Sequence, residues 1–331
     1  MIKTGIKDSY GREINYIRIS VTDRCNLRCR YCMPPEGVRF ARDDKLLTFG
    51  EIVRIADICG DMGIVNIRLT GGEPLVRKDI SFLIRELKSL PATKNLRLTT
   101  NGILLSGMLG GLAKAGLDGV NISLDTLDRE KYRMLTGYDG LEHVRDAVKK
   151  ALDMGCFSVK TNTVMLAGIN DSELPDIAAM ACNDSLMVRF IEVMPIGLGK
   201  KYAGISAGEV MKRISQVFGR PVPSRTASEG CGPAVYYRFP GLKGQIGFIS
   251  PLSEGFCPGC NKIRLTAEGR LKPCLQYGDG YDLRQIMRKG CTDDDIAALI
   301  QEAVMSKPLC HHFEEKNLPG EEKDLMSQIG G

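Results

Sequence analysis

Three cysteines near the start of the chain, Cys25, Cys29 and Cys32, are separated by three and two residues. Thiolates at this spacing can hold three irons of a cubane 4Fe–4S cluster and leave the fourth iron open to a ligand. Electron-carrier clusters are closed by four cysteines, so an open iron indicates chemistry on a bound molecule. A zinc knuckle or three unrelated cysteines are the alternatives, although zinc normally takes four ligands.

A second motif, Gly71-Gly72-Glu73-Pro74, follows downstream. Alone, the two glycines predict only a turn at the end of a strand. Together, the two motifs resemble those of the radical S-adenosylmethionine (SAM) enzymes. The resemblance implies that SAM binds the open iron through its amino and carboxylate groups. One electron from the cluster then splits SAM into methionine and a 5′-deoxyadenosyl radical.

The composition is that of a soluble globular protein, with 43% hydrophobic and 26% charged residues among 331. Twelve cysteines without a secretory signal indicate metal chemistry in a reducing cytoplasm rather than disulfides. No apolar run is long enough to span a membrane. The net charge of +5 is modest and scattered, which argues against nucleic-acid binding and suits a small anionic substrate.

The first two thirds of the chain alternate strand and helix patterns. One helix is expected to begin at Thr48, with Glu51 completing a capping box. Repeated βα units with short connections predict a parallel sheet under helices. Six units predict an α/β fold with an incomplete (β/α)6 barrel of the TIM type. The expected strands are 16–21, 65–70, 96–101, 119–125, 159–165 and 187–194.

These strands are not apolar throughout, as buried parallel strands usually are. Ile17 and Ile19 alternate with Arg18, and Ile67 and Leu69 alternate with Arg68. Because successive side chains point to opposite faces, the apolar set must meet the helices and the polar set must point inward. The pattern predicts a wet, cationic cavity inside the barrel. A half-exposed antiparallel sheet shows the same alternation and is the alternative.

The alternation of strand and helix patterns gives way to loops and short strands near residue 225. This change predicts a radical SAM barrel over residues 1–225 and a small C-terminal domain over 226–331, packed across the barrel mouth. Residues 234–239 and 245–249 are expected to be strands, and residues 282–307 are expected to be helical. A second cysteine set, Cys257, Cys260 and Cys274, lies in this part. It fits another 4Fe–4S cluster with an open iron. A zinc site is the alternative, although no fourth ligand is obvious.

With both cysteine sets, the chain resembles the GTP 3′,8-cyclase family of molybdenum-cofactor biosynthesis over nearly its whole length. The resemblance implies one cluster at each end of a central channel, with GTP between them. It also implies hydrogen abstraction from C3′ of GTP by the deoxyadenosyl radical, followed by attack of C3′ on C8 of guanine. The segments that carry it are 18–26, 31–34, 68–74, 99–102, 121–125, 189–195, 257–261 and the terminal Gly330-Gly331.

The resemblance also implies roles for individual residues. SAM contacts fall at Tyr31, Gly72, Glu73, Ser123 and Met194. GTP contacts fall at Arg18, Arg68, Thr99, Lys160, Lys262 and Arg264, with Thr100 in place of Thr99 if the strand register is shifted by one. Lys262 stands where the family often has arginine, so it keeps the charge without the planar fork. Guanine would bind the open iron of the second cluster.

Three further residues are assigned to catalysis. Arg189 matches a family position and is expected to assist electrostatically, with an outward structural ion pair as the alternative. Gly330 and Gly331 have no side chains and are expected to thread into the active site, with a frayed tail as the alternative. The remaining cysteines lack ligand spacing, and Cys310-His311-His312 is expected to make ordinary packing and surface contacts.

Two other functions compete with this interpretation: a peptide-modifying radical SAM enzyme with auxiliary clusters, and a zinc-binding interaction module without catalysis. The family implies a monomer or homodimer that receives electrons from a reductant. It passes its product to the cyclic pyranopterin monophosphate synthase.

Overall fold

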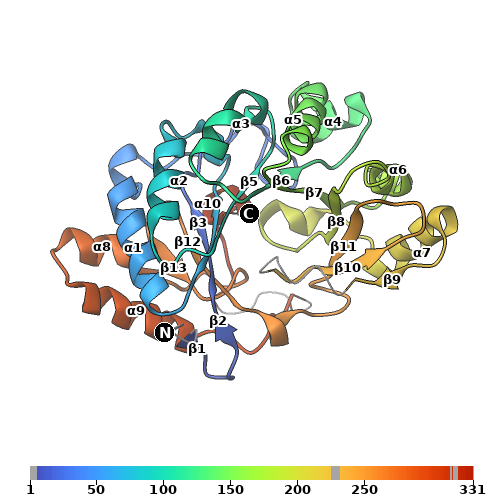
Figure 1. Cartoon of the computed structure of the whole chain (residues 1–331). Helices are drawn as coiled ribbons and strands as arrows, with labels where there is room; N and C mark the ends of the chain where they lie inside the picture. Colours follow the sequence, from blue (N-terminus) through green and yellow to red (C-terminus); the bar gives the residue numbers. More distant parts are fainter. Residues whose placement is uncertain (1–5, 225–231, 314, 316–319, 331) are drawn as a thin grey trace.

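One large curved sheet organises the chain (Figure 1). The computed structural model describes residues 6–224, 232–313, 315 and 320–330. The sheet has twelve strands in the order β14-β13-β12-β3-β4-β5-β6-β7-β8-β11-β10-β9, and the first two strands form a separate pair. The pair is β1 (Ile6–Lys7) and β2 (Glu13–Ile14), and the sheet comprises β3 (Tyr16–Ser20), β4 (Asn66–Thr70), β5 (Asn95–Thr100), β6 (Gly119–Ser123), β7 (Ser158–Met165), β8 (Met187–Glu192), β9 (Val222–Pro223), β10 (Val235–Arg238), β11 (Gln245–Ile249), β12 (Lys262–Leu265), β13 (Arg270–Lys272) and β14 (Tyr281–Asp282).

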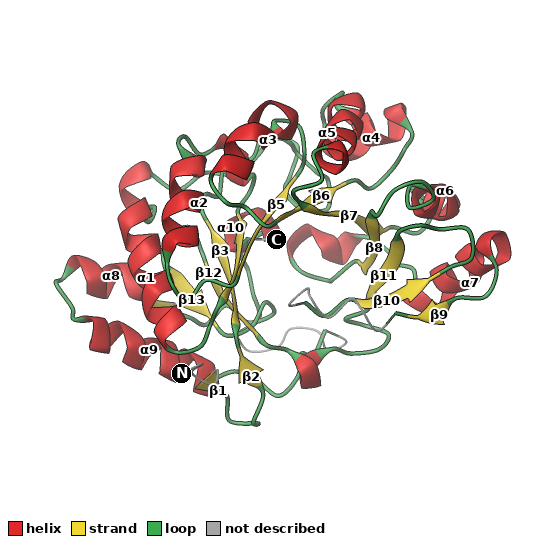
Figure 2. Ribbon diagram, viewed as in Figure 1, coloured by secondary structure: helices red, strands yellow, loops and turns green. Residues whose placement is uncertain are grey.

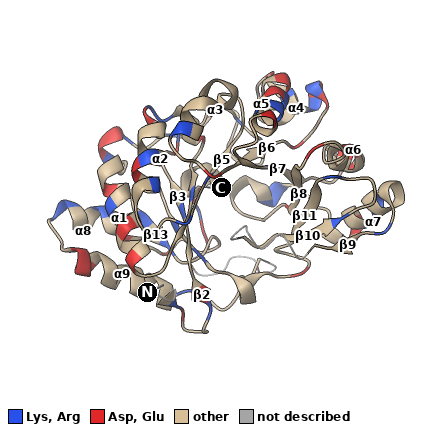
Figure 3. Cartoon of the chain, viewed as in Figure 1, with Lys and Arg blue, Asp and Glu red and all other residues tan. Residues whose placement is uncertain are grey.

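Helices cover the outer side of this curved row of strands (Figure 2). The α-helices of the described residues are α1 (Phe49–Asp61), α2 (Ile80–Ser89), α3 (Leu105–Lys114), α4 (Arg129–Thr136), α5 (Leu141–Asp153), α6 (Leu174–Ala179), α7 (Ala207–Phe218), α8 (Leu283–Arg288), α9 (Asp293–Met305) and α10 (Met326–Ile329). The short α10 lies near the middle of the molecule, inside the curve of the strands (Figure 1). Figure 3 shows charges of both signs on the outer helices. No helix of the described residues is long and apolar enough to cross a membrane.

The predicted strands and their two faces are confirmed. All six expected strands form, and β3 to β8 pair in parallel, which excludes the antiparallel alternative. Ile17, Ile19 and Leu69 are fully buried in the main hydrophobic core. Arg18 and Arg68 lie in register on the opposite face and line a cavity. The α/β class with a central parallel sheet therefore follows from the alternation in the sequence.

Local capping explains where the helices begin. Thr48 caps α1 and accepts from the backbone of Glu51, whose side chain accepts from the backbone of Thr48, as predicted. The helix expected over 282–307 is instead two helices, α8 and α9. Gly290 has a φ of +88° between them, and Thr292 caps the second helix. A residue with positive φ cannot continue a right-handed helix, so the chain turns there.

The C-terminal part of the chain extends both edges of the same sheet. Strand β11 pairs in parallel with β8, and β12 pairs in parallel with β3. The last third of the sequence therefore supplies neighbours to the first and last of the six predicted strands. The predicted domain boundary between residues 225 and 226 lies outside the described residues and stays a prediction.

Candidate active site

The first cysteine set lies on the loop that leaves β3. Backbone bonds from Cys32 and Met33 to the carbonyl of Cys29, at 2.8 and 3.0 Å, hold the loop in a tight turn. Burial raises the pKa of all three thiols, that of Cys32 to about 12. Three half-buried thiols held in one turn ionise readily only beside a cation. The donor set therefore fits an iron–sulfur cluster.

No three His, Cys, Asp or Glu side chains among the described residues are placed to hold a single metal ion. A cubane differs from a single ion in this respect, because each thiolate binds a different iron.

The glycine turn after β4 packs against the segment that leads into this loop. The N–H of Gly72 donates to the carbonyl of Thr22 at 2.8 Å, and the N–H of Glu73 donates to that of Arg24 at 2.7 Å. A Cβ on Gly72 would lie 2.5 Å from the Arg24 carbonyl oxygen. Glycine is required here because two backbone segments approach closely, which fixes the cysteine loop against the sheet.

Glu73 is buried and holds the ends of two strands together. Its carboxylate accepts from the N–H of Leu75 at 3.0 Å, the hydroxyl of Thr100 at 2.8 Å and the N–H of Asn101 at 2.6 Å. Burial raises its pKa to about 7, although these three bonds oppose the rise. Both Thr99 and Thr100 line the cavity, but the Thr100 hydroxyl is engaged by Glu73.

Asp125 is a second buried carboxylate beside the cysteine loop, and it is paired with the half-buried Tyr31. The Tyr31 hydroxyl donates to Asp125 Oδ2 at 2.5 Å, and the N–H of Val164 donates to Oδ1 at 2.8 Å. Burial raises the pKa of Asp125 to about 6. Ser123 at the end of β6 and Met194 after β8 line the same cavity. All five predicted SAM residues thus lie around one space.

Four arginines form a row across neighbouring strands. Arg264 on β12 pairs in register with Arg18, Arg18 with Arg68, and Arg68 with Arg97. Burial and the neighbouring cation Arg264 lower the pKa of Arg18 to about 9. Like charges placed directly opposite each other in a sheet are destabilising. A row of cations on one inner face therefore favours a polyanionic ligand.

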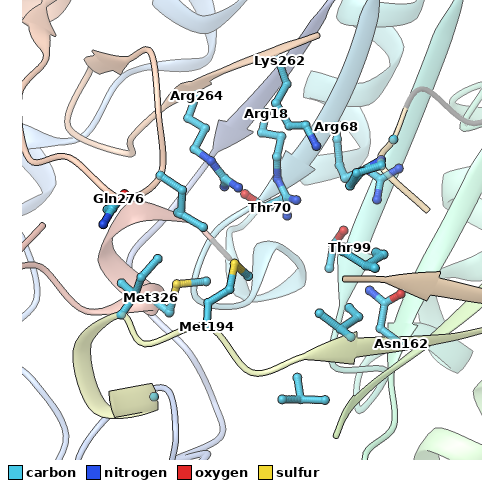
Figure 4. Close-up of a pocket in the computed structure, with 18 of the residues that line it drawn as sticks. Arg18, Arg68, Thr70, Thr99, Asn162, Met194, Lys262, Arg264, Gln276 and Met326 are labelled. Atoms are coloured by element: carbon cyan, nitrogen blue, oxygen red, sulfur yellow. The ribbon is translucent and has the colours of Figure 1, made fainter. Parts of the chain in front are cut away.

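Two more cations join this row inside the cavity. Lys262 lies two residues before Arg264, and burial lowers its pKa to about 7. Arg189 on β8 is 5% exposed and lines the cavity, so the alternative of an outward ion pair is wrong. Its Nε and Nη2 atoms, like Nε of Arg68, are buried without a hydrogen-bond partner among the described residues. Figure 4 shows Arg18, Arg68, Lys262 and Arg264 gathered around this space.

The second cysteine set borders the same cavity. Cys257 and Cys260 flank a short turn before β12, and Cys274 follows β13. Burial alone would raise the pKa of Cys260, but the ammonium groups of Lys307 and Lys262 outweigh it and lower this pKa. A thiolate favoured by neighbouring cations is suited to bind iron. Both cysteine sets and the cations line one continuous cavity.

Comparison with known proteins matches both halves of this arrangement. Residues 19–181 match the Radical SAM superfamily, and residues 186–313 match Molybdenum Cofactor Synthesis C. A GTP 3′,8-cyclase of Desulforamulus reducens is 44% identical over 327 residues, covering 98% of this chain and 99% of the relative. One of Pelotomaculum thermopropionicum is 46% identical over 329 residues, covering 98% and 100%. The chain belongs to the GTP 3′,8-cyclase family.

Solved structures support the fold. Streptococcus suis SuiB bound to the precursor peptide SuiA aligns with a TM-score of 0.60 at 17% identity, covering 87% of this chain and 66% of that chain. This chain therefore spans just under two thirds of the SuiB chain. At this identity the likeness concerns the fold alone.

Lys160 is the residue that differs most from its expected place in a GTP 3′,8-cyclase. Strand β7 has the expected register, but Lys160 is not among the described residues that line the cavity. Its Nζ lies 3.2 Å from the Tyr236 hydroxyl and over the Tyr236 ring. The Lys160 side chain therefore contacts β10. Sequence periodicity alone does not reveal that β10 lies beside β11. Contact of Lys160 with GTP stays a prediction.

The chain end reaches the cationic row. Arg264 Nη1 donates to the carbonyl of Gly330 at 2.9 Å. Gly330 has a φ of +80°, and a Cβ there would lie 2.8 Å from Thr70 Oγ1. Up to Gly330 the described tail is packed rather than frayed, and Gly331 lies outside the described residues. Roles of Gly330 and Gly331 in catalysis stay predictions.

Several cavity residues were not singled out from the sequence of this GTP 3′,8-cyclase family member. Strand parity is the signal that indicates two of them, because Asp125 lies two residues after Ser123 and Asn162 lies two residues after Lys160. Arg12, Gln276 and Cys310 also line the cavity. They lie on loops, where no periodic pattern indicates which way a side chain points.

Proposed function

We propose that this protein is a radical SAM GTP 3′,8-cyclase. It converts GTP to (8S)-3′,8-cyclo-7,8-dihydroguanosine 5′-triphosphate in the first step of molybdopterin cofactor biosynthesis. The observation that carries the proposal is that Arg18, Arg68 and Arg264 of the row line a cavity bordered by two three-cysteine sets. A buried cationic row needs a polyanion, and three-cysteine sets leave iron open for ligands. The family's relatives carry the name of this activity.

Each part of the chain has a place in this function. Cys25, Cys29 and Cys32 would hold the first 4Fe–4S cluster, and Cys257, Cys260 and Cys274 the second. When bound, the first cluster and SAM supply the deoxyadenosyl radical that removes the hydrogen from C3′ of GTP. Tyr31, Gly72, Glu73, Ser123 and Met194 orient SAM. Arg18, Arg68, Thr99, Lys160, Lys262 and Arg264 hold GTP, while Arg189 and the terminal glycines support catalysis.

The residues of the site contribute mainly by holding GTP and SAM in fixed positions relative to each other. The cationic row fixes the triphosphate through charge-assisted hydrogen bonds. The tail, anchored at Gly330 by Arg264, fills space beside the row and excludes water from it. Fixing the ribose relative to SAM and guanine converts the reaction into a step between held groups. Water exclusion protects the reactive species from side reactions.

The finer structural and cellular expectations belong to the same proposal. The six strands β3 to β8 act as an incomplete (β/α)6 barrel, and residues 226–331 act as the part that carries the second cluster. The protein works in the cytoplasm as a monomer or homodimer. It takes electrons from a reductant and passes its product to the cyclic pyranopterin monophosphate synthase. It binds neither nucleic acid nor membranes.

An anaerobic assay tests the activity. The reconstituted protein is incubated with SAM, dithionite and GTP, and the products are separated by chromatography and mass spectrometry. We expect 5′-deoxyadenosine and a cyclised nucleotide of the same mass as GTP, with neither product from Cys25→Ala. About eight irons per chain are expected for two cubanes. Zinc at one or two per chain, or no cyclised nucleotide, would overturn the proposal.

A further inference from the structure

Cys310 lies at the second cysteine set, although its sequence context indicated only ordinary packing. Among the described residues that line the cavity, Cys310 is the one cysteine outside the two motif sets. The segment before it is clamped by Arg12, whose Nη1 donates to the carbonyls of Cys257 at 2.9 Å and Leu309 at 2.8 Å. Nη2 of the same guanidinium donates to the Pro308 carbonyl at 2.6 Å. One side chain therefore ties the segment ending at Cys310 to a cysteine of the second set.

The residue after Cys310 makes the same connection from the other side. The backbone N–H of His311 donates to the sulfur of Cys257, and the N–H of His312 donates to Gln276 Oε1 at 2.7 Å. Cys310 is thus enclosed by contacts that join residues 308–312 to the loops carrying Cys257 and Cys274. Its thiol is a fourth sulfur facing the space that the second cluster would fill.

Cys310 also has an imidazole as a neighbour. Its Sγ lies 3.6 Å from Nε2 of His312, and Nδ1 of that ring lies 3.1 Å from Oε1 of Glu315. The Glu315 carboxylate thereby orients the imidazole beside the thiol. Iron binds a cysteine as its thiolate, so the thiol loses its proton when the bond to iron forms.

We propose that Cys310 binds the open iron of the second cluster while GTP is absent and is displaced when GTP arrives. The inference rests on the proposed function, because it requires a cluster on Cys257, Cys260 and Cys274. On binding, a sulfur–iron bond forms and the thiol proton is released to solvent. On displacement the bond breaks, the guanine takes the iron position, and Cys310 regains a proton from solvent. No electron is transferred in either direction.

This exchange would protect the cluster between turnovers. An open iron is the one that a cubane loses when it is oxidised, because no cysteine holds it. A displaceable thiolate closes the site without occupying it permanently. Displacement also costs GTP part of its affinity, since the binding-competent state is only a fraction of the resting protein.

The test isolates the second cluster. Cys25, Cys29 and Cys32 are all replaced by alanine, the protein is reconstituted anaerobically, and ferricyanide is added. Electron paramagnetic resonance then measures the 3Fe–4S signal. We expect little signal in this parent protein and a strong signal once Cys310→Ala is added. A matched control, Cys182→Ala, changes a partly buried cysteine that does not line the cavity and should behave as the parent.

Adding GTP distinguishes displacement of the Cys310 thiolate from a structural effect of the Cys310→Ala substitution. Added GTP should suppress the signal in the Cys310→Ala protein, because the nucleotide then covers the iron. In the reconstituted full protein, Cys310→Ala should bind GTP about tenfold more tightly if the thiolate caps about nine in ten resting molecules. Equal 3Fe–4S signals with and without Cys310, or unchanged GTP affinity, would overturn the inference. A parent protein without iron at the second set would instead contradict the proposed function.

Discussion

Replacing one arginine of the row should affect GTP binding and folding stability in opposite directions. We predict that Arg68→Gln weakens GTP binding by roughly 10- to 100-fold, since a charge-assisted hydrogen bond contributes about 1.5–3 kcal/mol. The same change should raise the free energy of unfolding of the ligand-free protein by a few tenths of a kcal/mol up to about 1 kcal/mol, because it removes a like charge from the row. Calorimetric titration with GTP and urea unfolding measure the two effects.

Arg97→Gln is the matched control for this prediction. Arg97 belongs to the same row but does not line the cavity, and its Nη1 donates to Ser158 Oγ at 3.0 Å. Its replacement should leave GTP affinity within about twofold of the wild type, because no contact with the ligand is lost. Equal loss of affinity in both variants would show that the row acts through the sheet and not by contact.

Asp125 gives a pH dependence whose sign is fixed by burial. Its pKa is raised from 3.8 to about 6 in the folded protein, so the native state binds more protons than the unfolded state between these values. The contribution of Asp125 to the free energy of unfolding is fully present below pH 4 and is lost as the pH rises through 6. Asp125→Asn keeps a group that can bond to Tyr31 and Val164 but does not titrate.

We therefore predict that Asp125→Asn becomes more stable relative to wild type as the pH rises from 4 to 7. A shift of about two pKa units corresponds to roughly 3 kcal/mol as an upper bound. Urea unfolding of the metal-free protein at a series of pH values measures the difference. Asp139→Asn is the control, because Asp139 is paired with Arg129 at the surface and its pKa is lowered. A parallel pH profile for wild type and Asp125→Asn would contradict the prediction.

At the scale of elements, a buried ion pair is one of the contacts that hold the C-terminal tail. Lys272 on β13 pairs with Glu322, and both side chains are at most 4% exposed. The N–H of Glu322 also donates to the Gln276 carbonyl at 2.7 Å. Beyond this anchor, α10 brings the N–H of Ser327 to the sulfur of Cys32 and leads to Gly330. The pair therefore helps to hold the tail on its path to the site.

We predict that Glu322→Ala destabilises the protein by about 3–5 kcal/mol, because Lys272 is left buried without its partner. The freed tail should become sensitive to carboxypeptidase, and GTP turnover should fall with it. Lys200→Ala is the control, since Lys200 pairs with the neighbouring Glu321 at 2.7 Å but is 45% exposed. An exposed pair contributes at most about 1 kcal/mol. A tail that resists digestion in Glu322→Ala would refute this role.

The elements also show how far sequence reasoning extends. Alternation in β3, β4 and β5 placed Arg18, Arg68 and Thr99 on the inner face, because a period of two requires no knowledge of distant strands. Periodicity does not reveal the surroundings of Lys160 and Cys310, because they come from segments more than 50 residues away along the chain. Such contacts depend on the order of strands in the sheet, which local periodicity does not encode.

At the scale of the whole molecule, the sheet order argues that the two parts of the chain fold together. Strands β3 and β8 are the ends of the six-strand series, and each is completed by a C-terminal strand. Ile263 of β12 and Phe248 of β11 are buried in the same core as Ile17 and Phe190. Without these strands, two parallel edges and their apolar side chains would face water.

We therefore predict that a fragment ending at residue 224 does not fold stably on its own. Exposed parallel edges with apolar faces favour aggregation, and the missing strands remove part of the core. Size-exclusion chromatography and hydrogen exchange of the fragment measure this directly. As the matched comparison, the full chain carries a protease site introduced between residues 224 and 232, and after cleavage its two pieces should elute together, because β8–β11 and β12–β3 hold them. A monomeric, exchange-protected fragment would instead indicate that residues 1–224 form an independent domain.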